Sequence, residues 1–319
     1  MEKREIGATG VYLTPLGFGT SGLGDMPDTY GYSVDEARAQ DTVRAIFDGP
    51  AQLIDTSNNY GQGRSEQRVG AVIKADGLPE GFTLSTKLDR DNATGRFDAA
   101  RAWASLEESC ERLGVDEIPL LFLHDPEHAR DLGEIEEKGG ALDALFEMKE
   151  KGRAKAVGLA MGRLDIMEPM LRSRPFDALI SHNRFTLLNR SAAPMFDYAA
   201  EQEIAVINAA PFAGGVLAKG AEAFPRISYQ EVGEEKLAPV RQIEAICARF
   251  GVPVGAVALQ FSMRDPRVTT TLLGVTKPER VAQALDWAAV GIPDDLWEAL
   301  GEVGSATSDP EADRVYKNG

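Results

Sequence analysis

Gln52-Leu53-Ile54-Asp55 is a short apolar run that ends on a carboxylate, and the same arrangement returns in Thr83-Leu84-Ser85-Thr86-Lys87 and in Leu120-Leu121-Phe122-Leu123-His124. Each run is typical of a buried strand, and a helical pattern follows each of them. Successive ends lie 32 and 37 residues apart, which is about one strand-plus-helix unit. Because strand ends in a parallel barrel meet at one face, we expect Asp55, Lys87 and His124 to face one site.

The same alternation of strand and helix extends over the rest of the chain. The strand candidates are apolar almost throughout, as expected for strands that are covered on both faces. Eight strands that are each followed by a helix predict an α/β fold, the (β/α)₈ or TIM barrel. The expected strands are 14–19, 52–56, 83–88, 119–124, 154–160, 178–182, 205–210 and 270–275, and the expected helices are 35–48, 65–75, 97–113, 138–151, 163–172, 191–202, 235–250 and 277–288.

Several segments fall outside this repeat. Residues 1–12 contain a glycine-bearing turn between two short runs and predict a β-hairpin that plugs the bottom of the barrel. Residues 255–264 and 292–302 predict extra helices toward the C-terminus. Residues 212–234 form a long loop, a candidate cofactor lid, and the polar segment from 304 is expected to wrap or fray. No linker divides the chain, so we expect one domain over 1–319.

Composition narrows the function. The net charge of −16 and the pI of about 4.7 argue against nucleic acid and anionic membrane as partners. No signal segment and no run of 18 apolar residues is evident, which predicts a cytoplasmic protein. Cys110 and Cys247 lie within helical patterns and are expected to be buried free thiols.

Tyr60, five residues beyond Asp55, completes a constellation for proton transfer. A free phenol has a pKa near 10, and a nearby ammonium such as Lys87 is expected to lower it. Asp55 can hold Lys87, and His124 can hydrogen-bond the reacting oxygen. Such a site exchanges a proton with an alcohol or a developing alkoxide. It contains no metal cage and no obvious nucleophile, so the remaining chemistry falls to a cofactor.

These residues resemble the aldo-keto reductase family. The resemblance rests on Ile54-Asp55-Thr56-Ser57-Asn58-Asn59-Tyr60-Gly61, Gly63-Arg64-Ser65-Glu66, Ser85-Thr86-Lys87, Leu123-His124 and Leu16-Gly17-Phe18-Gly19-Thr20, and it is collinear over essentially the whole chain. It implies a barrel enzyme that moves hydride between NAD(P)(H) and a carbonyl or alcohol. It also implies that Tyr60 is the acid and base and that Asp55, Lys87 and His124 are its partners.

The resemblance also assigns a cofactor site, with departures from the family pattern. Ala160-Met161 stand where many members carry Ser-Asn, and Ala209 stands where many stack an aromatic ring on the nicotinamide. His182 or Asn183 could replace the lost contact. Gly274 replaces a lysine, whereas Arg280 matches an arginine that grips a 2′-phosphate, so NAD and NADP both stay open, with NAD or dual use favoured for oxidation. The expected cofactor residues are Gly19, Thr20, His182, Asn183, Pro211, Phe212, Gly214, Gly215, Leu217, Gly274, Val275, Thr276 and Arg280.

Finer motifs point to a branch that handles sugars. They are His124-Asp125-Pro126-Glu127, Gly158-Leu159-Ala160-Met161 and the run His182 to Leu188, which resemble aldose, fucose and galactose dehydrogenases and pyridoxal dehydrogenase. We therefore expect oxidation of an aldose at C1 to its lactone, with Tyr30, His128 and Phe185 as substrate residues. The alternatives are an NADPH-dependent reductase of aldehydes or ketones, a pyridoxal dehydrogenase and, more remotely, a cofactor-sensing regulatory subunit. The sequence does not settle the preferred sugar or the oligomeric state.

Overall fold

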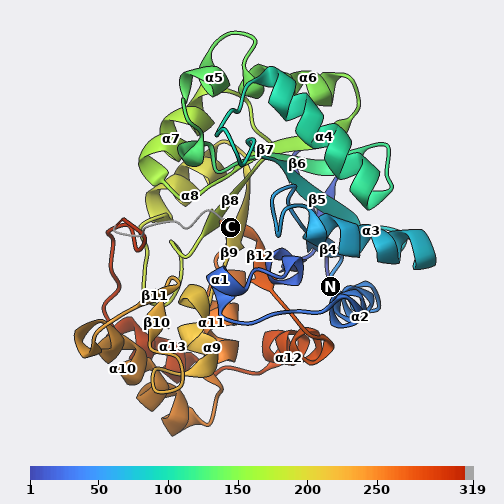
Figure 1. Ribbon diagram of the computed structural model, residues 1–319. Coiled ribbons are helices and arrows are strands. Elements are labelled where there is room, and N and C mark those ends of the chain that lie inside the picture. The colour runs from blue at the N-terminus through green and yellow to red at the C-terminus, as the bar shows by residue number, and fades with distance from the viewer. Residues whose placement is uncertain (313–319) are drawn as a thin grey trace.

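The computed structural model describes residues 1–312. Within them, eight parallel strands close into a barrel in the order β12-β3-β4-β5-β6-β7-β8-β9, which confirms the predicted (β/α)₈ fold. Helices surround the strands in Figure 1. The barrel strands are β3 (Leu16–Gly19), β4 (Leu53–Asp55), β5 (Thr83–Leu88), β6 (Ile118–His124), β7 (Ala154–Ala160), β8 (Ala178–His182), β9 (Ala205–Ala209) and β12 (Val268–Gly274).

The long helices that follow these strands agree with the periodicity of the sequence to within a few residues. Asp35 and Asp98 cap two of them, because each carboxylate accepts the backbone N–H three residues on. The helices are α2 (Glu36–Phe47), α3 (Arg64–Asp76), α4 (Ala99–Leu113), α6 (Ala141–Glu150), α7 (Leu164–Ser173), α8 (Ala193–Glu201), α10 (Glu234–Phe250), α11 (Val254–Met263), α12 (Pro278–Ala289) and α13 (Asp294–Gly301).

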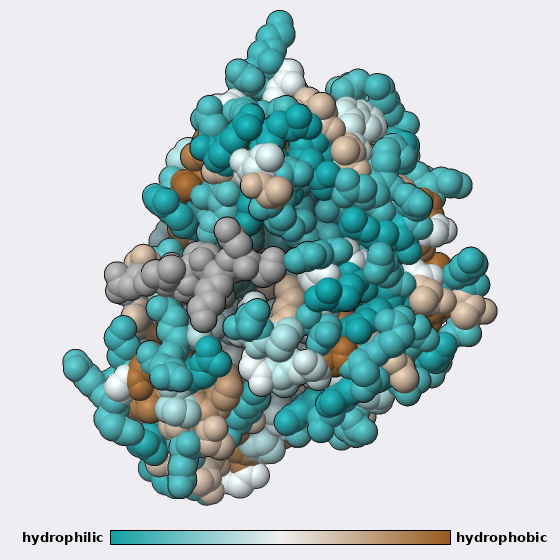
Figure 2. Space-filling view, viewed as in Figure 1, coloured by the Kyte–Doolittle hydropathy of each residue, from teal (hydrophilic) through white to brown (hydrophobic). Residues whose placement is uncertain are grey.

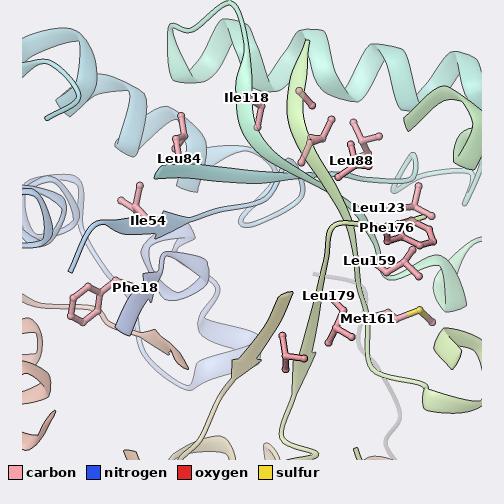
Figure 3. Close-up of a cluster of buried hydrophobic side chains, with 14 of the residues drawn as sticks. Phe18, Ile54, Leu84, Leu88, Ile118, Leu123, Leu159, Met161, Phe176 and Leu179 are labelled. Carbon is pink, nitrogen blue, oxygen red and sulfur yellow. The ribbon is translucent and has the colours of Figure 1, made fainter. Parts of the chain in front are cut away.

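Alternation along the strands produces two apolar layers. Leu53, Leu120 and Phe122 belong to the cluster inside the barrel, whereas their neighbours Ile54 and Leu123 belong to the larger cluster shared with the helices. Figure 3 shows members of this larger cluster on successive barrel strands, including Ile54, Leu84, Leu123, Leu159 and Leu179. Burial of both layers holds the strand ends, and therefore the site, in place.

The N-terminal hairpin lies where the sequence predicts it. β1 (Arg4–Glu5) pairs antiparallel with β2 (Tyr12–Leu13), and Ile6, Val11 and Leu13 join the cluster inside the barrel. Arg4 Nη1 donates to the carbonyl of Val268 at 2.7 Å, at the start of β12. The hairpin therefore closes the amino-terminal end of the barrel and leaves the opposite mouth for a site.

The segment 212–234 is more ordered than the expected loop. It contains a short hairpin, β10 (Arg226–Ile227) with β11 (Gln230–Glu231), whose tip residues Ser228 and Tyr229 have positive φ. Periodicity cannot reveal elements of two to four residues, so the sequence analysis missed them. The other short elements are η1 (Ser21–Gly24), α1 (Pro27–Tyr30), η2 (Pro126–His128), α5 (Gly133–Glu136), η3 (Ala213–Gly215) and α9 (Val216–Lys219).

The described part of the C-terminal segment packs against the barrel. Ala306 bridges Asn189, and Glu311 is buried, so residues 304–312 wrap around the barrel; the rest of the expected tail lies outside the described residues.

Within residues 1–312, no individual helix has the length and apolar character to cross a membrane, although α10 and α11, bent by 101° at their junction, meet that test as a pair. Cys110 and Cys247 are buried and free. Figure 2 shows a mostly hydrophilic surface in this view.

Candidate active site

The carboxyl ends of the strands surround a cavity of about 930 Å³ at the barrel mouth. Asp55, Lys87 and His124 end or nearly end β4, β5 and β6, and all three line this cavity together with Tyr60. The sequence prediction that these four side chains share one place is therefore met by the geometry.

Lys87 and Asp55 form a buried ion pair at the floor of the cavity. Lys87 Nζ donates to Asp55 Oδ2 at 2.7 Å and to the carbonyl of Thr56 at 2.6 Å. Ser85 Oγ donates to Asp55 Oδ1 at 2.9 Å, which satisfies the other carboxylate oxygen. With Lys87 2% exposed, neither side chain can turn away into water, so the ammonium stays fixed.

Tyr60 lies between this ammonium and the imidazole. Lys87 Nζ is 4.7 Å from the centre of the Tyr60 ring, and the Tyr60 and His124 rings meet edge to face with centroids 5.6 Å apart. Burial, together with the charge of Asp55, raises the pKa of Tyr60 well above the ordinary value. The expectation of a lowered pKa is therefore wrong for the protein alone, because burial and then the charge of Asp55 raise it. Tyr60 is held as a neutral phenol, ready to donate its proton.

His124 is held by residues that the sequence analysis missed. Its Nδ1 lies 2.7 Å from Asp89 Oδ1 and 3.0 Å from Ser57 Oγ. Asp89 follows β5 directly, two residues beyond Lys87, and Ser57 stands two residues beyond Asp55. A second polar residue at the same strand end is the signal that could have identified Asp89.

Small residues from four strand ends line part of the cavity. Gly19, Ala160, Ala209 and Gly274 stand at the ends of β3, β7, β9 and β12, and no atom lies within 4 Å of where a Cβ on Gly274 would stand. A flat ring can therefore approach Tyr60 and its partners past these small residues. The residues present fit a nicotinamide, which when bound would accept or supply hydride.

The expected cofactor residues divide into three groups. Gly19, His182 and Gly274 line the cavity. Thr20, Asn183, Leu217 and Val275 are buried behind it, and Phe212 packs edge-on against Trp287. Pro211, Gly214, Gly215, Thr276 and Arg280 lie on the segments that follow β9 and β12.

The side chain of Asn183 is hydrogen-bonded to the C-terminal segment, which the sequence did not predict. Its Nδ2 donates to Glu311 Oε1 at 2.5 Å, and its Oδ1 is buried with no hydrogen-bond partner among the described residues. His182 Nε2 lies 3.4 Å from Glu311 Oε2. An unpartnered amide oxygen on the residue next to His182, which lines the cavity, is the kind of acceptor that a carboxamide requires.

Two further cations accompany Arg280. Burial, then the charges of Arg280 and Arg226, lower the pKa of Lys219. Lys219 ends α9 and Arg226 begins β10, so both come from the segment that the sequence analysis treated as a lid. Three neighbouring cations that repel one another are suited to a polyanion such as the phosphates of a dinucleotide.

Two of the three expected substrate residues line the cavity, and the third does not. Tyr30 and His128 line the cavity, and Tyr30 meets Tyr229 edge to face. Phe185 does not line it: this ring is 2% exposed and packs against Phe196 and Phe261, with centroids 5.0 and 5.2 Å away. The expectation for Phe185 is wrong, because the chain turns at the end of β8 and directs this side chain into the core.

A barrel with a buried Asp–Lys pair, a phenol and an imidazole at its carboxyl-terminal mouth is an architecture for carbonyl and alcohol redox chemistry. Residues 15–304 match the model of the aldo/keto reductase family, and the chain belongs to this family. It is accordingly an NAD(P)-dependent oxidoreductase that acts on small carbonyl or alcohol substrates.

Characterised relatives span nearly the whole chain. D-threo-aldose 1-dehydrogenase of a Pseudomonas species is 32% identical, with 92% of this chain and 95% of the relative covered. Pyridoxal 4-dehydrogenase of Microbacterium luteolum is 28% identical over 95% and 97%, and L-galactose dehydrogenase of Arabidopsis thaliana is 28% identical over 100% and 98%. The holo form of an aldo-keto reductase from Bacillus halodurans superposes with a TM-score of 0.78 at 20% identity, over 99% and 100%.

Proposed function

We propose that the protein oxidises an aldose at C1 to the lactone, with NAD or NADP as the hydride acceptor. The observation that carries the proposal is the meeting of Tyr60, Lys87, Asp55 and His124 in a cavity of about 930 Å³. The names of the aldose and galactose dehydrogenases among the relatives support a sugar as the substrate.

The cavity rim has the chemistry of a sugar site. Asn59, Gln62 and Asn92 offer amide donors and acceptors, and Asp25 and His128 add charged or titratable groups. Hydroxyl groups of a sugar both donate and accept, and such mixed lining satisfies both. The aromatic faces of Tyr30 and Tyr229 can cover the apolar side of a pyranose ring.

In this proposal Tyr60 is the residue that exchanges a proton with the oxygen at C1. The Lys87–Asp55 pair keeps an ammonium beside the phenol and stabilises negative charge that develops on the Tyr60 oxygen when it gives or takes that proton. His124 faces the same oxygen and supplies a hydrogen bond. Tyr60, Lys87, Asp55 and His124 are thus proposed as the catalytic residues.

Cofactor residues are proposed on the same ground. Gly19, Gly274 and His182 face the cavity, the segment from Pro211 to Leu217 follows β9 in the chain, and Val275, Thr276 and Arg280 lead from β12 into α12. α12 begins with Pro278 at its first position and has no side-chain cap, and the positive end of its helix dipole suits a phosphate. Lys219 and Arg226 add positive charge. We propose binding of either NAD or NADP, with Arg280 as the contact that would favour NADP.

A panel of substrates with both oxidised cofactors tests the proposal. D-threo-aldoses, L-galactose and other aldoses should each be assayed with NAD⁺ and NADP⁺ by the absorbance of reduced nicotinamide, and lactone formation should be checked by NMR. Turnover of aldoses supports the proposal. Turnover confined to aldehydes with NADPH, or to pyridoxal, would replace it with one of the alternatives.

Pyridoxal oxidation is the second candidate, and a group of tyrosine rings at the cavity favours it. Tyr30 and Tyr229 line the cavity and meet edge to face, and the ring of Tyr32 stacks on Tyr30 with centroids 6.0 Å apart. A pyridine ring stacks on such a surface as readily as a sugar does. Relative kcat/KM values for pyridoxal and the best aldose therefore decide between them.

A further inference from the structure

His124 is held on both sides by carboxylates that lie outside the four-residue constellation. Asp89 Oδ1 is 2.7 Å from Nδ1 of the ring, and Asp125 Oδ2 is 3.6 Å from Nε2. Asp89 is 1% exposed and follows β5, whereas Asp125 follows β6 and lines the cavity. The two ring nitrogens therefore have different surroundings: Nδ1 faces the protein interior, and Nε2 faces the cavity side.

Asp89 is itself fixed as an acceptor. Ser57 Oγ donates a short hydrogen bond to Asp89 Oδ2, and the backbone N–H of Asn59 donates to the same oxygen at 3.0 Å. Burial alone would raise the pKa of Asp89, but the charge of His124 and the hydrogen bonds from His124, Ser57 and Asn59 leave it below the ordinary value. An ionised carboxylate has no proton to give, so Nδ1 of His124 carries the proton between them.

We propose that Asp89, held by Ser57, is a positioning residue that keeps a proton on Nδ1 of His124 and turns Nε2 toward the reacting oxygen. This inference rests on the proposed function, because the reacting oxygen is that of the alcohol or carbonyl. No covalent bond forms or breaks at Asp89 or His124. The ring only donates a hydrogen bond to the oxygen at C1.

The charge state of the ring follows from the groups that face it. Burial lowers the pKa of His124 and Lys87 opposes a second positive charge, but the charges of Asp125 and Asp89 outweigh both and raise this pKa above the ordinary value. Tyr60, the fourth neighbour, is neutral. The raised pKa favours the doubly protonated ring, in which Nε2 donates from a cation, and a charged donor strengthens the hydrogen bond.

Histidine NMR tests the inference without a substrate. The chain has three histidines, so ¹⁵N-histidine labelling of the full chain gives a simple spectrum, and His124→Gln identifies the signals of His124. We expect Nδ1 to stay protonated on both sides of the titration. Asp89→Asn should lower the pKa of His124 by about one unit or more, whereas Asp286→Asn, an exposed change of the same charge on α12, should not. An unprotonated Nδ1 in the wild-type protein overturns the inference.

Kinetics separate positioning from a structural role. With whichever carbonyl or alcohol the panel identifies, Asp89→Asn should lower kcat by roughly 10–100-fold, leave KM for the cofactor within about twofold, and shift the pH profile to lower pH. Ser57→Ala is a milder variant that removes one hydrogen bond to Asp89 and should shift the pKa of His124 in the same direction. Unchanged kcat and pH profile in folded Asp89→Asn contradict the inference. A wild-type tautomer as expected, with no sugar oxidised, would instead contradict only the proposed function.

Discussion

At the scale of single residues, the phenol of Tyr60 is the group on which the chemistry depends. It lies beside the Lys87 ammonium and edge-on to His124, and its pKa is held high by burial and Asp55. A neutral phenol suits donation to a carbonyl oxygen. Oxidation of an alcohol needs the reverse transfer, for which a cationic nicotinamide nearby would favour the phenolate.

Tyr60→Phe removes the proton without removing the ring. Turnover should fall by roughly 10²–10⁴ because general acid–base catalysis is lost. The dissociation constant of the cofactor, measured by quenching of protein fluorescence, should stay within about threefold of the wild-type value. A variant that keeps wild-type turnover excludes Tyr60 from the reaction.

His124 links stability to pH. Since its pKa is raised in the folded protein, its contribution to stability is fully present below the ordinary value of 6.5 and is lost as pH rises through the folded value. The stability advantage of the wild-type protein over His124→Gln should therefore shrink as the pH rises above 6.5. Urea denaturation at several pH values measures this difference, and a constant difference would show that the ring does not titrate in this range.

At the scale of elements, the ends of three barrel strands share a backbone feature. Asp125, Asn183 and Ala210 follow β6, β8 and β9 directly, and each has a positive φ. Their N–H groups donate to carbonyls of the next strand, for example Asp125 to Ala160 at 2.9 Å. Left-handed backbone at non-glycine residues is costly, and here it turns the chain away from the barrel immediately beside the cavity.

Gly214 packs closely against the tip of the β10–β11 hairpin. Its φ is +78°, and a Cβ there would lie 2.7 Å from the backbone nitrogen of Tyr229. Gly214→Ala should destabilise the protein by about 1–3 kcal/mol and displace Tyr229 from the cavity. Thermal unfolding and KM for the best substrate measure the two effects. Gly291→Ala, where no atom lies within 4 Å and φ is not positive, is the control and should change neither.

Long strands and helices were predictable because hydrophobic period and length agree over ten or more residues. Tyr60, Asp55, Lys87 and His124 were found because each stands at or near a strand end. Asp89 and Ser57 were missed, since a polar residue next to a predicted site is as often a loop residue. Phe185 was wrongly assigned to the substrate site, because it lies in a loop after β8 where no repeating pattern indicates the direction of a side chain.

At the scale of the whole molecule, the C-terminal segment ties the last part of the described chain to the barrel mouth. Arg184, 1% exposed, donates to both oxygens of Asp309 at 2.7 and 3.0 Å, and Glu311 binds Asn183. These contacts depend on residues more than 120 positions apart in sequence. No local pattern could reveal them, which is why the sequence analysis left open whether this segment wraps.

Asp309→Ala leaves Arg184 buried without its bidentate acceptor. We expect a loss of about 1–3 kcal/mol in the free energy of unfolding, because the buried guanidinium then loses the carboxylate that accepts its two shortest hydrogen bonds. Denaturation by urea measures the loss, and Glu298→Ala, an exposed carboxylate on α13, serves as the control. Equal stability of the two variants would show that the segment contributes nothing to the fold.

The transfer of hydrogen from C1 tests the central claim most directly. An aldose that carries deuterium at C1 should be incubated with the protein and oxidised cofactor, and the products analysed by NMR. We predict deuterium at C4 of the reduced nicotinamide and a lactone free of it, with both products reduced by roughly 10²–10⁴ in rate in Tyr60→Phe. Deuterium retained in the sugar, or a full rate without Tyr60, would contradict the account.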